Sequence, residues 1–287
     1  MPPPKVTFIT GCSSGLGLTT ALRLIQSGHI VHATVRSVED QKALIQQCNH
    51  SKNLFVSLLD LSNDKEIEET ACKILSQHPS IDSIIFNAAS TLIGPPDSAS
   101  ISEIEYLFKV NVFSTLKIAQ IFLPQMRKNK KGHLIFIGSI LGIESSGYLG
   151  VYSATKFALE ALASSWASIL YKWNIKTTII EPGAINTNLP NTTMTGSYYK
   201  NSLLEDPYEN FNKQASLFLK ACLKQGIDPN KVADLIIEIL NNPSPALRYQ
   251  TCPFSKNLVQ KHLRDPESKE WLEEHRQFLE SFYQPLN

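Results

Sequence analysis

The regular alternation of short, apolar, β-branched runs with longer segments of helical periodicity is the feature that most constrains the fold of this chain. The apolar runs predict strands at residues 6–10, 30–35, 54–59, 83–86, 133–138 and 176–180. Between them, helical periodicity is found at residues 16–25, 39–47, 64–77, 102–127 and 150–173. Continuously apolar strands that alternate with helices are typical of a parallel sheet covered on both faces. The sequence therefore predicts an α/β fold with a doubly wound parallel sheet.

The 287 residues fit one large domain, and the chain contains no internal repeat or low-complexity linker. We expect residues 1–250 to form a single domain of the Rossmann type, and residues 251–287 to form a C-terminal helical extension. Residues 211–240 again have a helical pattern, and residues 246–250 predict one more strand. The stretch at about 186–225 begins beyond the carboxyl end of a strand, where open α/β sheets place ligands and lids, so we expect it to be a substrate loop.

Composition and charge exclude several classes of function. A net charge of +1 gives no overall field that would draw the chain to nucleic acid or to an anionic membrane. No apolar stretch approaches the roughly 20 residues of a transmembrane helix. The five cysteines are odd in number and lack zinc-ligand spacing, which predicts free thiols in a reducing compartment and no metal site. Because the chain starts without a secretory signal pattern, the expected location is the cytoplasm.

A glycine-rich turn follows the first predicted strand, with glycines spaced as G-x-x-x-G-x-G. Glycines at such a strand-to-helix junction allow a sharp turn and a close approach of phosphate oxygens to main-chain amides. The start of the helix adds free N–H groups and a partial positive charge. Alone, the glycines would fit a plain turn with a helix cap equally well, but their place in a βαβ unit favours a dinucleotide. The residues expected to bind its pyrophosphate are Gly11, Ser13, Ser14, Gly15, Leu16 and Gly17.

The end of the second predicted strand indicates which dinucleotide is bound. An acidic residue there would hydrogen-bond the adenosine ribose of NAD, but this strand ends in Val35-Arg36-Ser37. The planar guanidinium of Arg36 can bind a 2′-phosphate, with Ser13 or Ser14 assisting. The chain therefore favours NADP(H) over NAD(H). The alternative is that Arg36 is an ordinary surface charge.

Tyr152 and Lys156 lie one helical turn apart at the start of a predicted helix, so their side chains share one face. An ammonium near a phenol stabilises the phenolate and lowers the phenol pKa from its usual value of about 10. Such a pair is common by chance, but Ser139 follows the preceding strand, and its hydroxyl could bind a substrate oxygen. Asn111 is an amide in an apolar helical stretch, and its partner is either functional or only a helix-bending water.

These motifs together resemble the short-chain dehydrogenase/reductase family over roughly residues 5–190. Each match is modest alone, but their order and spacing are very specific. The matching segments are Thr10-Gly-Cys-Ser-Ser-Gly-Leu-Gly17, Asp60-Leu61, Asn87-Ala88, Asn111, Ser139, Tyr152-x-x-x-Lys156 and Pro182-Gly183. Within the family, the chain most resembles the 17β-hydroxysteroid and retinol dehydrogenase branch, through Cys12-Ser-Ser14, Ala33-Thr-Val-Arg36, Ser153-Ala-Thr-Lys-Phe-Ala-Leu-Glu160 and Pro245-Ala-Leu-Arg-Tyr249.

The resemblance implies a role for each residue of a catalytic tetrad. Tyr152 would donate or accept the proton, and Ser139 would orient the carbonyl. Lys156 would bind the nicotinamide ribose and lower the tyrosine pKa, while Asn111 would hold a relay water. Cofactor contacts are implied for Asp60, Leu61, Asn87, Ala88, Ala89, Tyr152, Lys156, Pro182, Gly183, Ile185 and Thr187.

One departure from the family pattern lies after the fourth predicted strand. The family usually has Asn-Ala-Gly where this chain has Asn87-Ala88-Ala89, so the extra methyl of Ala89 is expected to shift the cofactor slightly or to cost some affinity. Family members commonly dimerise through the long helices after strands four and five. The resemblance therefore also implies a homodimer or homotetramer.

The sequence predicts an oxidoreductase that transfers a hydride between NADP(H) and the carbonyl or secondary alcohol of an apolar small molecule. Steroid-like and retinoid-like substrates follow from the resemblance and from apolar residues near the expected cleft, although ordinary packing would explain these residues equally well: Leu92, Ile93, Leu141, Ile143, Tyr148 and Leu149. The alternative is a catalytically silent NADP(H)-binding regulator or scaffold, which the presence of both Tyr152 and Lys156 disfavours. Epimerisation or dehydration by the same pair is a third interpretation, and the glycine spacing disfavours it.

Overall fold

The computed structural model describes residues 4–78, 80–187, 193–199, 204–264, 269–280 and 282. In this part of the chain, seven parallel strands form one sheet in the order β3-β2-β1-β4-β6-β7-β9. The strands are β1 (Val6–Ile9), β2 (Ile30–Val35), β3 (Leu54–Leu58), β4 (Ser83–Phe86), β6 (Gly132–Ile137), β7 (Ile175–Glu181) and β9 (Arg248–Gln250). The strand order reverses between β1 and β4, which opens a crevice at their carboxyl ends. The predicted doubly wound sheet is confirmed.

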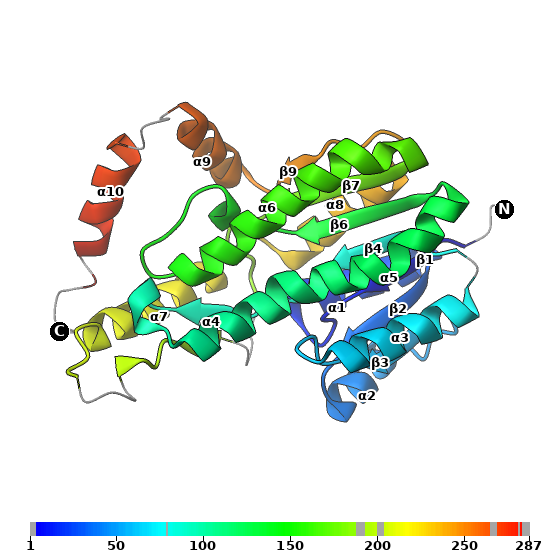
Figure 1. The fold of residues 1–287 in the computed structure, drawn as a ribbon, viewed down its shortest axis with the longest axis horizontal. Coiled ribbons are helices and arrows are strands. Elements are labelled where there is room, and N and C mark those ends of the chain that lie inside the picture. Colours follow the sequence, from blue (N-terminus) through cyan, green and yellow to red (C-terminus); the bar gives the residue numbers. More distant parts are fainter. Residues whose placement is uncertain are drawn as a thin grey trace.

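Helices cover both faces of this sheet, as Figure 1 shows. On one face, α3 (Asp64–Gln77), α5 (Ser114–Asn129) and α6 (Gly150–Leu170) bury a core that contains Phe122 and Phe136. On the other face, α1 (Gly15–Gln26), α2 (Val38–Gln47) and α8 (Pro229–Asn241) bury aliphatic side chains. Burial of both faces explains why the strand sequences are continuously apolar rather than alternating.

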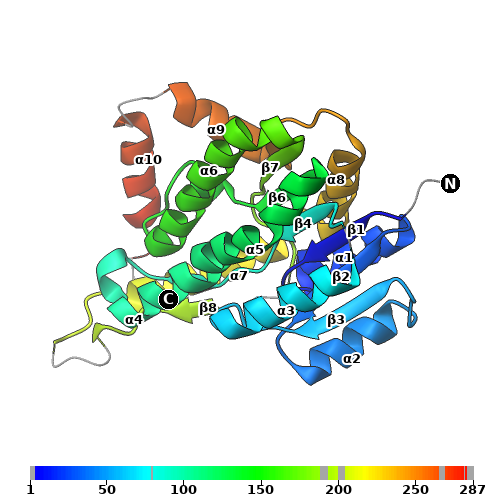
Figure 2. The ribbon, with the colours of Figure 1, turned by 45° about the vertical axis from the view of Figure 1, so that its right-hand side comes forward.

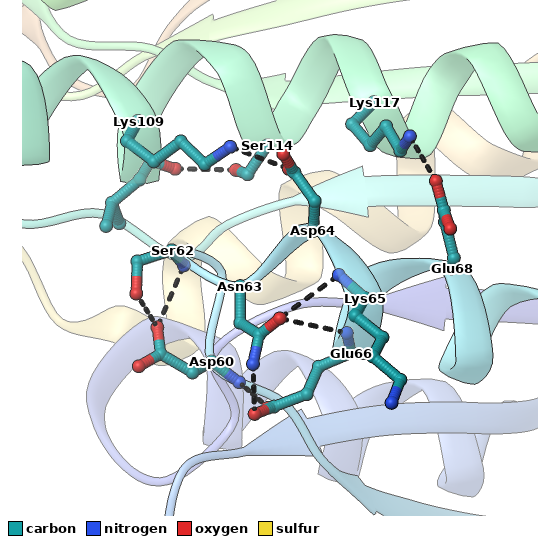
Figure 3. A network of polar contacts seen from close by, with 11 residues as sticks. Asp60, Ser62, Asn63, Asp64, Lys65, Glu66, Glu68, Lys109, Ser114 and Lys117 are labelled. Atoms are coloured by element: carbon teal, nitrogen blue, oxygen red, sulfur yellow. Dashed lines mark hydrogen bonds and ion pairs between the residues drawn. The ribbon is translucent and has the colours of Figure 1, made fainter.

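The long helix predicted at 102–127 is divided in the structure. It consists of α4 (Ile101–Phe108), a π-helical turn (Lys109–Phe113) and α5. Lys109 in the π-helical turn and Lys117 in α5 pair with Asp64 and Glu68 of α3 (Figure 3). Apolar periodicity continues across the turn, so the pattern alone does not reveal that the hydrogen-bond ladder changes there.

A second, two-stranded parallel sheet was not predicted. It pairs β5 (Thr91–Ile93) with β8 (Thr193–Thr195), and three residues are too few to show a strand pattern. β8 belongs to the predicted substrate loop at 186–225, which also contains α7 (Glu209–Lys224). Residues 188–192 and 200–203 of that loop lie outside the described residues.

The C-terminal part of the chain contains α9 (Pro253–Arg264) and α10 (Lys269–Glu280), which stand beside α6 at one end of the molecule (Figures 1 and 2). Phe278 of α10 and Phe218 of α7 have ring centroids 5.0 Å apart, and both rings pack near Tyr148. The C-terminal helix α10 therefore packs against α7 and Tyr148. The boundary at residue 250 stays a prediction. Short 3-10 helices occur at Pro96–Ser98, Ile140–Gly142 and Tyr171–Trp173.

A capping box fixes the start of α4 and also binds the segment after β8. The Ser100 side chain accepts a hydrogen bond from the Glu103 N–H, and the Glu103 Oε2 accepts one from the Ser100 N–H at 2.8 Å. The same Oε2 accepts a hydrogen bond from the Ser197 N–H at 3.2 Å. Glu103 therefore connects two segments that are far apart in the sequence.

We expect Glu103→Ala to lower the free energy of unfolding by about 1–2 kcal/mol, because two backbone N–H groups lose their acceptor. Urea denaturation measures this change. Glu105→Ala is the matched control, since Glu105 is exposed on the same helix and should change the free energy of unfolding by about 0.5 kcal/mol or less. Equal losses in the two variants would contradict the connecting role of Glu103.

Candidate active site

A cleft of about 550 Å³ opens at the carboxyl ends of the strands. It brings together every predicted site residue except Asn111. The predicted residues in its wall are Gly11, Ser13, Ser14, Gly15, Leu16, Gly17, Arg36, Asp60, Leu61, Asn87, Ala88, Ala89, Ser139, Tyr152, Lys156, Pro182, Gly183, Ile185 and Thr187. Residues that follow the strands from β1 to β7 therefore lie together in the wall of one cleft.

The glycine turn forms the floor of one end of the cleft. Gly11 has φ +72° and Gly15 has φ +55°, a conformation that favours glycine. A Cβ atom on Gly17 would lie 2.0 Å from the carbonyl oxygen of Gly11, so no side chain fits there. Ser14 precedes α1 and makes no side-chain cap hydrogen bond. The first N–H groups of α1 therefore have no side-chain cap, which suits a phosphate.

Asn87 braces this turn from the end of β4. Its Nδ2 donates hydrogen bonds to the carbonyl oxygens of Thr10 and Gly11, both at 2.9 Å. The Thr10 hydroxyl accepts hydrogen bonds from the N–H groups of Asn87 and Ala88, at 3.2 and 3.1 Å. The Asn87 amide thus holds the turn in shape.

Ala89 adopts an ordinary backbone conformation. Among the described residues, only Asn49, His50, Lys130 and Asn174 are non-glycine residues with a positive φ. The position that is usually glycine in the family does not require left-handed backbone in this chain. The effect of the Ala89 methyl group on the cofactor stays a prediction.

Arg36 directly follows β2 and is exposed in the wall of the cleft. No acidic side chain in the described part of the chain forms an ion pair with it, so its guanidinium is available to an anion. Asp60 is held in a turn before α3, because its Oδ1 accepts hydrogen bonds from the N–H and hydroxyl of Ser62, both at 2.8 Å (Figure 3). Its neighbour Leu61 is buried.

Tyr152, Ser139 and Lys156 form the chemical centre of the cleft. The Tyr152 hydroxyl hydrogen-bonds the Ser139 hydroxyl. The Lys156 Nζ lies 5.5 Å from the centroid of the Tyr152 ring and donates a hydrogen bond to the Ile137 carbonyl at 2.8 Å. The positions of the three side chains follow from the start of α6 and the end of β6.

The protonation of these groups differs from the expectation that Lys156 lowers the pKa of Tyr152. Burial raises the pKa of Tyr152 well above its usual range, and the hydrogen bond from Ser139 offsets only part of this rise. Burial also lowers the pKa of Lys156 to about 8. The Lys156 ammonium donates its hydrogen bond to the backbone carbonyl of Ile137. Desolvation is the largest cause of the pKa shift of both Tyr152 and Lys156. The phenol is therefore protonated at neutral pH.

Asn111 lies in the π-helical turn behind the cleft wall and is buried. Its Oδ1 accepts a hydrogen bond from the Ser90 N–H at 2.8 Å. Its Nδ2 donates to the Ser90 carbonyl at 2.9 Å and to the Thr155 hydroxyl at 3.0 Å. The side chain therefore links the segment after β4 to α6, the helix that carries Tyr152. The relay water stays a prediction.

One end of the cleft is apolar and draws on α7, which lies in the predicted substrate loop, and on α9 and α10 of the predicted C-terminal extension. Of the six apolar residues proposed near the cleft, Leu141, Tyr148 and Leu149 line it, whereas Leu92 and Ile93 are buried in the core and Ile143 does not line it. The apolar residues that were missed are Phe218, Leu219, Leu223, Phe254, Leu258 and Phe278, from α7, α9 and α10. Their amphipathic helices were the available signal, but helical periodicity does not show which surface a face covers.

The described residues lack two other features. No group of three His, Cys, Asp or Glu side chains there is arranged to hold a metal ion. None of the described helices combines the length and apolar character needed to cross a membrane. The arrangement in the cleft suits acid–base chemistry, because the protonated Tyr152 phenol beside the Ser139 hydroxyl can give a proton to an oxygen atom.

Comparisons with known proteins agree with this geometry. Human retinol dehydrogenase 8 is 28% identical over 257 residues, which cover 86% of this chain and 81% of that protein. Human 17-beta-hydroxysteroid dehydrogenase type 1 is 28% identical over 276 residues, which cover 93% of this chain and 83% of that protein. A crystal structure of a short-chain dehydrogenase from Streptomyces avermitilis is 28% identical, with a TM-score of 0.81 over 96% of this chain and 98% of that one.

Two less similar structures share the fold and contain dinucleotides. A short-chain dehydrogenase/reductase from Burkholderia phymatum in complex with NAD is 19% identical, with a TM-score of 0.81 over 92% of this chain and 94% of that one. A metagenomic short-chain oxidoreductase in complex with NADP is 22% identical, with a TM-score of 0.68 over 86% and 97% of the two chains.

The family model of short-chain dehydrogenases matches residues 5–196, well over half of the chain. The match includes the glycine turn, Asn111, Ser139, Tyr152 and Lys156. This protein is therefore an oxidoreductase that belongs to the short-chain dehydrogenase/reductase family and is similar to its hydroxysteroid and retinol dehydrogenase branch.

Proposed function

We propose that this protein transfers a hydride between NADP(H) and the carbonyl or secondary alcohol of an apolar small molecule, with Tyr152 as the proton donor or acceptor. The observation that carries the proposal is the convergence of Tyr152, Ser139 and Lys156 in the same cleft as the glycine turn. When bound, the dinucleotide supplies or takes up the hydride. The uncapped first N–H groups of α1 and the absence of space for a side chain at Gly17 fit its pyrophosphate.

In the direction of reduction, Tyr152 gives its proton to the carbonyl oxygen while the Ser139 hydroxyl donates a hydrogen bond to the same oxygen. The raised pKa of Tyr152 keeps that proton on the phenol before the reaction. The charge that then forms on the phenolate is stabilised by the Lys156 ammonium, which is already buried beside the ring. We assign the nicotinamide ribose to Lys156 and the nicotinamide amide to Ile185 and Thr187.

Arg36 favours NADP(H) over NAD(H). It is exposed at the end of β2, on the wall of the cleft, where the adenosine ribose of a bound dinucleotide would lie. A guanidinium there binds a 2′-phosphate through charge-assisted hydrogen bonds.

The substrate proposed is apolar, of the steroid or retinoid kind. Support comes from the aromatic and aliphatic wall that α7, α9 and α10 add to the cleft. The names of two relatives, a retinol dehydrogenase and a 17-beta-hydroxysteroid dehydrogenase, favour the same class. We also propose a cytoplasmic location, since all five cysteines are free thiols.

The assembly proposed is a homodimer or homotetramer formed through the outer faces of α5 and α6. Phe113, which directly precedes α5, and Phe157 and Ile169 in α6 are 50%, 42% and 49% exposed. Apolar side chains of this size that face solvent on neighbouring helices favour burial against a second copy.

Tyr152→Phe removes the transferable proton, and we expect turnover of a carbonyl panel with NADPH to fall by about 10²–10⁴-fold. NADPH consumption measures the rate. Tyr171→Phe is the control, because Tyr171 is 66% exposed beyond the end of α6. Turnover that survives in the Tyr152 variant would contradict the mechanism.

Arg36→Ala should raise the KM for NADP(H) by about tenfold or more, because a charge-assisted hydrogen bond to the phosphate is lost. The KM for NAD(H), which lacks that phosphate, should change by about twofold at most. Steady-state kinetics with both cofactors tests this. Equal changes for the two cofactors would remove the case for a 2′-phosphate site.

Light scattering after gel filtration should give a mass that is a multiple of the 32.0 kDa chain. Phe157→Glu should shift the protein toward the monomer, since an ionised carboxylate is costly to bury in an interface. Val38→Glu is the control, because Val38 is similarly exposed (43%) but lies on α2. A monomeric wild-type protein would refute the assembly.

A further inference from the structure

Two buried glutamates lie directly behind the cleft. Glu160 is in α6, one turn beyond Lys156, and its side chain is 9% exposed. Glu181 is the last residue of β7, immediately before Pro182 and Gly183 of the cleft wall, and its side chain is fully buried. The proposed function gives neither carboxyl group a role.

One arginine serves both carboxyl groups. The Arg248 Nε donates a hydrogen bond to the Glu160 Oε2 at 2.9 Å and lies 3.3 Å from the Glu181 Oε1. The Glu181 Oε2 also accepts a hydrogen bond from the Gln250 side chain at 2.6 Å. β9, which carries Arg248 and Gln250, thus supplies one positive charge for two acids.

Among the described residues, no other element that packs around the two carboxyl groups brings a cation closer to them than Arg248. On α6, the Lys156 ammonium donates to Ile137 instead. The 3-10 helix Ile140–Gly142 carries no charge. The segment leading into α9 contributes Cys252, whose thiol lies near Gly183.

The burial of both carboxyl groups around a single cation favours one proton on the pair. The Oε1 atoms of Glu160 and Glu181 are both buried and receive no hydrogen bond from a donor group in the described part of the chain. Two ionised carboxylates buried around one guanidinium repel each other, and a proton on one of them removes this repulsion and provides a donor toward the other. Burial, together with the charge of Glu181, raises the pKa of Glu160 to about 7.

This pair is packed tightly against the active-site backbone. The Gly138 N–H donates to the Ile180 carbonyl at 2.8 Å, and the Ile140 N–H donates to the Pro182 carbonyl at 3.1 Å, so the end of β7 holds the segment that contains Ser139. A Cβ atom on Gly142 would lie 3.0 Å from the Lys156 carbonyl oxygen and 3.2 Å from the Glu160 Cγ. Little space remains for α6 and β7 to adjust independently of that segment.

We propose that Glu160 and Glu181 share one proton, act as positioning residues for the nicotinamide end of the cleft, and loosen that end when the proton is lost in alkaline solution. Without the proton, two carboxylates would face one arginine, and their repulsion would separate α6 from the end of β7. The wall formed by Pro182 and Gly183 would then bind the dinucleotide less well. The effect on the cofactor rests on the proposed function, whereas the shared proton does not.

The first arm of the test measures stability. The pKa of Glu160 in the folded protein is about 7, above its value of 4.5 in the unfolded chain. The protonated carboxyl group therefore stabilises the fold fully below pH 4.5, and this stabilisation is lost as the pH rises through about 7. Glu160→Gln keeps a donor toward Glu181 but cannot titrate. Between about pH 5 and pH 9, the Tm of the wild type should fall by several degrees relative to that of Glu160→Gln. Glu105→Gln, an exposed change on α4, should follow the wild type at every pH.

The second arm measures the affinity for NADPH by calorimetry. The wild type should bind about tenfold more weakly at about pH 9 than at about pH 6.5, while Glu160→Gln should show only the smaller loss that deprotonation of Lys156, with its pKa of about 8, causes in both proteins. The KM for the cofactor should rise with pH more than kcat falls. Glu181→Gln, which also keeps one donor between the two side chains, should show the same flattened profile and provides the test if Glu160→Gln does not fold.

Three outcomes separate the claims. A Tm difference that does not depend on pH in either variant would overturn the shared proton. Stability that depends on pH with an affinity that does not would overturn the positioning role. Failure of the wild type to bind any nicotinamide dinucleotide at any pH would overturn the proposed function instead, and the stability arm would still decide whether the proton is shared.

Discussion

The hydrogen bonds from the Asn87 amide to the carbonyl oxygens of Thr10 and Gly11 join the ends of β1 and β4, the two strands between which the sheet changes direction. The glycine turn and the segment that follows β4 both start at this junction. The glycine turn can bring its backbone against Asn87 only because Gly17 has no side chain, and α1 starts from that turn. The same strand end leads to Ser90, which binds Asn111 and so connects the turn to the helix of Tyr152.

Buried polar groups, rather than apolar packing, determine the positions of the reactive side chains. Lys156 is tied to Ile137, Tyr152 to Ser139, and Asn111 to Ser90 and Thr155, each inside a largely apolar shell. A buried polar group that loses its partner costs more than an exposed one, so each bond restricts the side chain to one geometry. This precision suits a reaction in which a proton and a hydride reach one carbonyl group.

Most of the sheet could be predicted from the sequence, because strands buried on both faces are continuously apolar and their helices are amphipathic. The turn, Ser139, Tyr152 and Lys156 could be placed because parallel strands end at one edge. The π-helical turn around Asn111 could not, since it changes the hydrogen bonds without interrupting the apolar pattern. The protonation of Tyr152 was misjudged because the sequence shows the neighbouring lysine but not the burial that outweighs it. The pairing of Glu160 with Glu181 and Arg248 required the fold.

The aromatic cluster that joins Tyr148 and Phe218 to Phe278 has a consequence for the order in which the protein matures. The glycine turn, Arg36 and the tetrad all lie before the end of α6 in the chain, whereas Phe278 lies in α10, far later in the sequence. During synthesis, the residues of the glycine turn and of the tetrad are therefore made before the apolar wall of the cleft is complete. A chain that stops before α10 would keep the glycine-turn end of the cleft. It would expose the apolar wall near Tyr148 and Phe218 to water and to chaperones.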